Sequence, residues 1–283
     1  MPQSPLKQAM AHPVTHRMRA LRAVAGREIG KFFQQPGRML SSLVRPLLWF
    51  LVFAAGFQNI FGVAIIAPYQ TYIEYKVYMA PGLLAMIALF NGMQSSLAMV
   101  YDREMGVMLL LLTAPLPRGW LLACKLLGGM LLSLLQMLAF LLVALGFGVT
   151  FAWQDLPGAL AVMALAALML GALGLLLSVH VRQLENFAGT MNFVIFPMFF
   201  ISSALYPLWK LEESGATIVY QLARANPFTH AVEAIRFALY GQAQWSSLAV
   251  VAGCAALFFT LALRGYDPQR GVARAARDLR AGR

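Results

Sequence analysis

The sequence predicts an all-α membrane protein that crosses the bilayer with six transmembrane helices. Hydrophobic residues make up 60% of its 283 residues and charged residues only 12%, whereas about a quarter of a soluble domain is charged. The apolar residues also fall in uncharged runs of about 20 residues, the length that a helix needs to cross a bilayer. A soluble protein would need a charged surface around its core, and this composition does not provide one.

The placement of the basic residues predicts both a partner and an orientation. The net charge of +11 lies mainly before the first apolar run and after the last one, which favours contact with membrane lipid and disfavours nucleic acid. Of the 22 Lys and Arg residues, 18 fall in the N-terminal region, the segments 102–125 and 180–185 and the C-terminal region. We therefore expect both termini on the cytoplasmic side, an arrangement that six spans satisfy.

The first region, residues 1–38, is expected to hold a cytoplasmic tail and one amphipathic helix. Between 17 and 33 apolar residues recur at steps of three and four, with basic residues on the other side. This pattern is typical of a helix that lies in the membrane interface. Gln35, Pro36 and Gly37 are expected to end it.

The transmembrane domain is predicted over residues 39–264, followed by a basic cytoplasmic tail over 265–283. Its expected spans are 43–61, 78–100, 126–150, 158–179, 187–206 and 246–263. The fourth span is rich in Ala and Gly, which lets helices approach closely within lipid. The segment 207–245 is too polar to span and is assigned to the outer face, with a short helix capped by Asn226 and begun by Pro227.

Little in this chain predicts catalysis. The sequence motifs of zinc peptidases, α/β-hydrolases, dithiol enzymes and Walker-type ATPases are missing, and no metal or cofactor is expected on the chain itself. Almost no ionisable residue is expected in the middle of a span, where ion-driven transporters place theirs. We therefore expect the energy source to be another subunit.

The segment 102–118 is the place where such a subunit is expected to act. Charged residues at both ends bracket a short apolar helix that Pro115 and Pro117 end. A helix of this kind lies along the cytoplasmic face, and it either inserts into a groove of a partner or rests on lipid. The composition supports both alternatives equally.

This segment resembles the coupling region of the type-2 ABC exporter permeases. The matching residues are Arg103, Glu104, Gly106, Leu111, Leu112, Pro115, Pro117, Arg118 and Lys125. Further matches, in the order of that family, are Arg27-Glu28, Gln35-Pro36, Pro81-Gly82, Asn226-Pro227-Phe228 and Glu233 to Arg236. The chain departs from the family at Leu109 and Leu110, where members commonly carry a polar residue, so more of the expected contact rests on Glu104 and Arg118.

The resemblance implies a permease subunit of a bacterial-type inner (plasma) membrane. It would pair with a second copy or a related permease and bind two ABC ATP-binding subunits, which would hold ATP and Mg. The residues expected to couple to the ATPase are Arg103, Glu104, Gly106, Leu111, Leu112, Pro115 and Arg118, and the outer-face motif is Asn226, Pro227, Glu233 and Arg236. Glu233 and Arg236 are expected to form an exposed surface pair.

Polar residues of the second and fifth spans are candidates for lining a substrate path: Asn91, Gln94, Ser95, Asn192 and Ser202. An interhelical hydrogen bond explains any one of them at least as well. Two alternative functions stay open: a secondary transporter, or a membrane-embedded enzyme for lipid-linked substrates. The second would use Glu212, Glu213, His230, Glu233 and Arg236. The residues do not identify the substrate.

Overall fold

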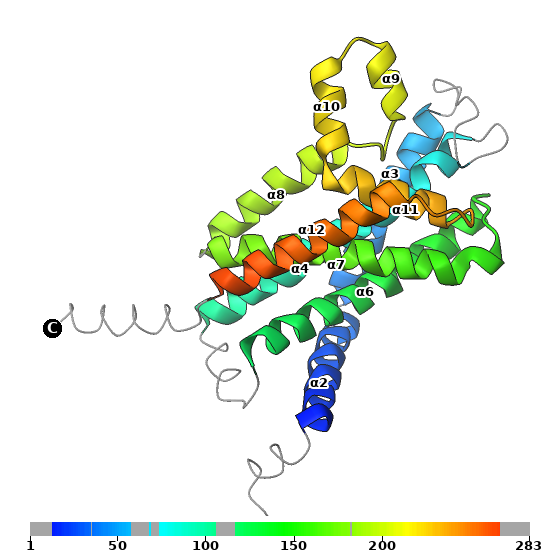
Figure 1. The fold of residues 1–283 in the computed structure, drawn as a ribbon. Helices are drawn as coiled ribbons and strands as arrows, with labels where there is room; N and C mark the ends of the chain where they lie inside the picture. The colour runs from blue at the N-terminus through cyan, green and yellow to red at the C-terminus, as the bar shows by residue number, and fades with distance from the viewer. Residues whose placement is uncertain are drawn as a thin grey trace, which may run out of the picture.

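The computed structural model describes residues 13–34, 36–57, 68, 74–105, 117–181 and 183–266. Within these ranges every regular element is a helix. The helices form an elongated bundle, with α2 (Pro13–Gln34) at one end and α9 (Leu208–Glu213) at the other (Figure 1). We call these ends the α2 end and the α9 end. The all-helical fold expected from the sequence is therefore confirmed for the described residues.

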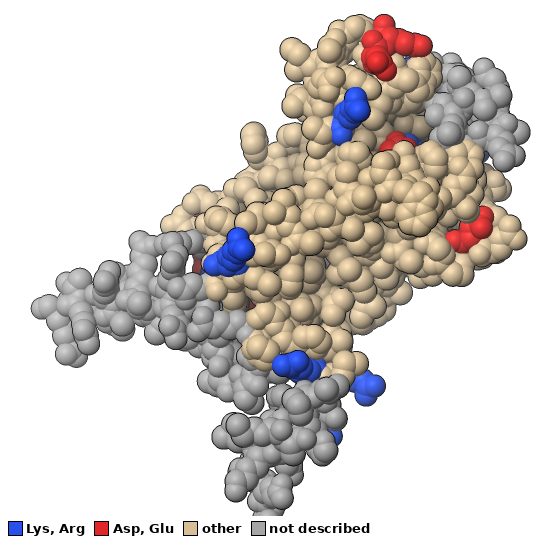
Figure 2. Space-filling model, in the orientation of Figure 1, with Lys and Arg blue, Asp and Glu red and all other residues tan. Residues whose placement is uncertain are grey.

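Among the residues that the structure describes, four helices are long and apolar enough to cross a membrane. They are α4 (Tyr75–Glu104), α6 (Arg118–Gly146), α7 (Leu156–His180), which the 3-10 helix η1 (Trp153–Asp155) precedes, and α12 (Trp245–Gly265). They agree with the second, third, fourth and sixth predicted spans. The face shown in Figure 2 carries its charged side chains toward its edges, and its broad middle is uncharged, as the surface of a membrane bundle requires.

The first predicted span corresponds to α3 (Pro36–Phe57), which begins earlier than residue 43. Proline is well tolerated at the first position of a helix, where its missing N–H has no partner to lose. The apolar part of α3 found in the described residues is Val44–Phe53, shorter than a full span. Arg45 lies inside this helix, as its tenth residue.

The fifth predicted span, 187–206, is wrong at its end. Helix α8 covers Leu184–Phe200, 17 residues, and the chain then bends. The hydroxyl of Ser202 donates to the carbonyl of Phe199 and accepts from the N–H of Ala204, at 2.6 and 3.2 Å. Such local side-chain bonds compete with the helical ladder, so the helix stops before the hydrophobic run does.

Glycines decide how closely the central helices pack. A Cβ built on Gly92 of α4 would lie 2.9 Å from the Cα of Gly171 in α7, and one on Gly174 would lie 2.6 Å from the carbonyl oxygen of Gly92. Only glycine permits this approach of two backbones. The close packing that the small residues of the fourth span predict is thus present between α7 and α4.

The amphipathic helix predicted over 17–33 is α2, which begins at Pro13. It lies along α6: the indole N–H of Trp120 donates to the carbonyl of Arg17 at 3.1 Å, and Ala25 is buried where Gly128 leaves room. At the α9 end, α10 (Thr217–Ala225) and α11 (Pro227–Ala238) follow α9. Asn226 caps α11 by accepting from the N–H of Phe228 at 2.9 Å, as predicted.

Candidate functional site

Two clusters of polar residues lie at opposite ends of α4. The first, the Asp102 cluster, consists of Asp102, Arg103 and Glu104 in the last turn of α4 together with Lys125 of α6. The Asp102 carboxylate accepts from the Lys125 ammonium at 3.0 Å, and the two side chains are only 9% and 10% exposed. This buried pair joins the neighbouring ends of two antiparallel spans.

Arg103 and Glu104 hold the two sides of the turn between α7 and α8. The Arg103 guanidinium donates to the carbonyls of Ser178 and Val181 at the end of α7, at 3.0 and 2.9 Å. The Glu104 carboxylate accepts from the N–H of Leu184, the first residue of α8, at 2.8 Å. A cation thus meets the end of a helix that is partly negative, and an anion meets the partly positive start of the next. The end of α4 is therefore tied to two other helices.

The other expected coupling residues are only partly described. Gly106, Leu111, Leu112 and Pro115 lie outside the described residues, and Arg118 is the first residue of α6. Sequence reasoning quoted Lys125 but missed its pairing with Asp102. The sequence could have predicted this pair, because Asp102 and Lys125 lie at the neighbouring ends of two consecutive antiparallel spans. The backbone partners of Arg103 and Glu104 left no signal in the sequence.

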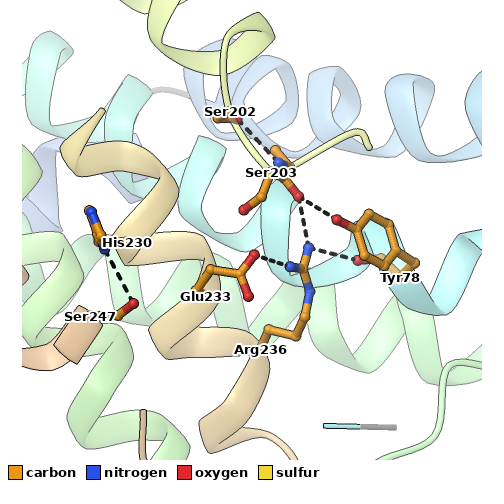
Figure 3. Close-up of polar contacts among 8 residues, drawn as sticks. Tyr78, Ser202, Ser203, His230, Glu233, Arg236 and Ser247 are labelled. Atoms are coloured by element: carbon orange, nitrogen blue, oxygen red, sulfur yellow. Dashed lines mark hydrogen bonds and ion pairs between the residues drawn. The ribbon is translucent and has the colours of Figure 1, made fainter. Parts of the chain in front are cut away.

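The second cluster, the Arg236 cluster, consists of Tyr75, Tyr78, Glu233 and Arg236 around the bend that follows α8. Figure 3 shows Tyr78, Glu233 and Arg236 beside Ser203. Arg236 is 2% exposed. Its guanidinium forms an ion pair with Glu233, donates to the carbonyl of Ser203 at 2.8 Å and lies 4.1 Å from the centre of the Tyr78 ring. The predicted pairing of Glu233 with Arg236 is confirmed, but the expected surface exposure is wrong, because the bend and α4 cover the guanidinium.

Side chains of this cluster donate hydrogen bonds to the backbone carbonyls of the bend over residues 201–206. The Tyr78 hydroxyl donates to the carbonyl of Ser203 at 2.9 Å and the Tyr75 hydroxyl to that of Leu205 at 2.6 Å. The bend also lies directly on α4, where a Cβ on Gly82 would come within 2.7 Å of the Cα of Ala204. Away from water, carbonyls that leave a helix need such internal donors.

Asn226 and Pro227 complete the outer-face motif. The Asn226 amide donates to the carbonyls of Met198 and Ile201 at 2.8 and 2.6 Å, while its oxygen caps α11. Pro227 occupies the first position of α11. Asn226, Glu233 and Arg236 are thus brought together around the end of α8.

The residues considered for an enzymatic site are engaged elsewhere. The two ring nitrogens of His230 lie 3.3 Å from the Ser247 hydroxyl and 3.1 Å from the Arg224 carbonyl (Figure 3). Glu212 and Glu213 are exposed on α9. In the described part of the chain no three His, Cys, Asp or Glu side chains gather in a way that could hold a metal. Burial also raises the pKa of the Tyr240 phenol to about 12, so this hydroxyl stays a donor to the Thr150 carbonyl.

The candidate path-lining residues are not gathered in one place. The Asn91 amide donates to the Gln136 side-chain oxygen at 2.6 Å, and Ser202 is fully buried in the bend. Gln94 and Ser95 are half-buried and border two different small cavities, whereas Asn192 is exposed on α8. Their role in a path stays a prediction.

Arg45 is an exception to the expectation that almost no ionisable residue lies in the middle of a span. Its guanidinium lies 4.3 Å from the centre of the Phe90 ring, and Phe90 stands midway along α4. Arg45 falls within the predicted first span, 43–61, although it was counted with the basic residues of the N-terminal region.

Comparison with known proteins places this architecture among transporters. Residues 19–240 match the family model of the ABC-2 type transporter. A putative transport permease, ycf38, of Cyanophora paradoxa is 31% identical over 225 residues, which cover 75% of this chain and 71% of the relative. The daunorubicin resistance ABC transporter permease protein DrrB1 of Streptomyces coeruleorubidus is 25% identical over 264 residues, covering 91% and 87%.

Proposed function

We propose, from the premise that this chain belongs to the ABC-2 type transporter family, that it moves its substrate outward with ATP hydrolysed by a separate subunit. Membership makes the chain a membrane-spanning permease subunit of an ABC transporter, and the family implies association with an ATP-binding subunit. In the proposal that subunit holds ATP and Mg. The permease pairs with a second copy or a related permease in the plasma membrane of a bacterial-type cell.

Two observations support the outward direction and the orientation. One relative is named for resistance to daunorubicin, a property that export of a compound provides. At the α2 end, the described basic residues include those of α2 together with Arg103, Arg118 and Arg264 at the ends of α4, α6 and α12, so we assign this end to the cytoplasm. The ATP-binding subunit then docks there, beside the Asp102 cluster.

The contacts of Arg103 and Glu104 carry the proposal. Both residues belong to the segment 102–118, which is expected to act on the ATP-binding subunit, and both bind the turn between α7 and α8. A displacement of that segment therefore reaches α4, α7 and α8 together. Rigid helices joined by charged hydrogen bonds are suited to passing such a movement along the bundle.

The test is purification of the tagged chain from its native membrane. An ATP-binding protein is expected to co-purify, and substrate movement in vesicles is expected to stop when ATP is depleted. Absence of such a protein, together with transport that ignores ATP, would overturn the proposal.

A variant separates coupling from assembly. Glu104→Ala is expected to weaken docking or transport at least severalfold while the amount of chain in the membrane stays the same. Glu185→Ala is the matched control, because Glu185 is an exposed glutamate in the first turn of α8. Full transport by the Glu104 variant would contradict the coupling role.

A further inference from the structure

Arg45 lies near mid-depth of the helical bundle. At a rise of ~1.5 Å per residue, its partner Phe90 is ~18 Å along α4 from Asp102 and ~21 Å from Lys76. Asp102 and Lys76 mark the charged ends of this helix. Arg45 is also exposed on the surface of the single chain. A charged side chain at such a depth is costly against lipid, so it is found facing a protein interior or a water-filled cavity.

A small cavity beside Arg45 collects hydrogen-bond donors. It lies between α3, α4 and α6 and is lined by Arg45, Pro46, Met86, Ile87, Phe90, Asn91, Gln94 and Gln136. The side-chain oxygen of Gln136 is taken by Asn91. The amide nitrogen of Gln136, on a residue only 2% exposed, has no hydrogen-bond partner among the described residues. A buried donor without a partner indicates a ligand or water that the site is built to receive.

Among the described residues, no acidic side chain forms an ion pair with Arg45. Its 11 acidic residues are Glu28, Glu74, Asp102, Glu104, Asp155, Glu185, Glu212, Glu213, Glu233, Asp267 and Asp278. Those in the described part lie in α2, in the end turns of spanning helices or in the segments that join them, and the other two follow α12.

We propose that Arg45, with the free amide of Gln136 and with Gln94, binds an anionic group of the transported molecule, a phosphate or a carboxylate. The inference rests on the proposed function, because it assigns the cavity as a binding site along the path of the transported substrate. Arginine binds such groups through paired N–H donors. Met86, Ile87 and Phe90 offer apolar contacts to the part of the molecule that carries the anion.

Binding of radiolabelled decyl phosphate tests the proposal. The permease with its ATP-binding subunit is placed in phosphatidylcholine nanodiscs, and binding to empty nanodiscs is subtracted. Arg45→Gln is expected to weaken binding by roughly 30-fold, and Arg45→Lys by much less. Arg45→Glu is expected to prefer decyltrimethylammonium. Arg224→Gln removes the same charge from the exposed face of α10 and is expected to bind like the unchanged chain.

Competition identifies the source of the anion. Displacement of decyl phosphate by phosphatidylglycerol in the nanodisc would identify a lipid headgroup, and displacement by glucose 6-phosphate would identify a soluble anion. Either result supports an anionic ligand.

The proposal is overturned if the unchanged complex binds no more decyl phosphate than empty nanodiscs, or if Arg45→Gln binds as well. It is also overturned if Arg45→Lys loses as much binding as Arg45→Gln. Each of these results leaves the proposed function standing when the ATP-binding subunit still co-purifies. If that subunit does not co-purify and transport ignores ATP, the proposed function fails, and binding is then measured on the permease alone.

Discussion

The Asp102 cluster and the Arg236 cluster use charge for the same purpose in different surroundings. Each supplies donors or acceptors to backbone groups at a helix end. The Arg236 guanidinium is fully enclosed, whereas Glu104 of the Asp102 cluster is exposed. The enclosed cluster holds an irregular bend that needs internal partners. The exposed one leaves part of its charge accessible to another protein, so we expect the first to govern stability and the second coupling.

The largest effect is expected at Arg236. Arg236→Leu removes the donor to Ser203 and leaves Glu233 without the cation it pairs with. Breaking one side of a buried pair costs about 3–5 kcal/mol, measured as the free energy of unfolding in mixed SDS micelles. Arg224→Leu is the matched control. Equal stability of the two variants would mean that the enclosure of Arg236 contributes nothing.

The Asp102–Lys125 pair is expected to rank second. Asp102→Leu leaves a nearly buried ammonium without its carboxylate and is expected to cost about 2–3 kcal/mol in the same unfolding measurement. Adding Lys125→Met removes the unpaired charge and is expected to restore most of that loss. If the double variant is as unstable as the single one, the cost arises from packing and not from charge.

Loss of the helix cap at Glu104 should have a smaller effect on stability. Glu104→Ala removes the acceptor of the Leu184 N–H and is expected to cost about 1 kcal/mol. The measurement is hydrogen–deuterium exchange, which should quicken over the first turn of α8. Glu104→Gln keeps an acceptor oxygen and should retain most of the protection. If both variants exchange at the same rate as the unchanged chain, the Glu104 carboxylate does not stabilise the start of α8.

The smallest effect is expected for an exposed pair at the start of α4. Glu74 and Lys76 lie 2.6 Å apart with side chains 52% and 24% exposed. Glu74→Ala should change the free energy of unfolding by less than about 1 kcal/mol. If Glu74→Ala lowers the free energy of unfolding as much as Asp102→Leu does, burial does not explain the difference between the two ion pairs.

Local patterns predicted the parts of the structure that depend on neighbours in the sequence. Uncharged apolar runs predicted the four long spans, because burial in lipid acts on each helix by itself. The Asn226 cap and Pro227 at the start of α11 were also predicted, since a cap joins residues two positions apart. The family resemblance pointed to residues near both ends of α4 without supplying their contacts.

The sequence by itself determined that this chain is a membrane protein and where its four long apolar helices lie. Only the tertiary structure decided that Arg236 is enclosed, that α8 ends at Phe200, and that Arg45 lies against Phe90. Arg103 meets the carbonyl of Val181 across 78 positions, and Arg236 meets that of Tyr78 across 158. Hydrophobic periodicity acts within one helix, while these hydrogen bonds join backbone groups that become neighbours only when the helices pack.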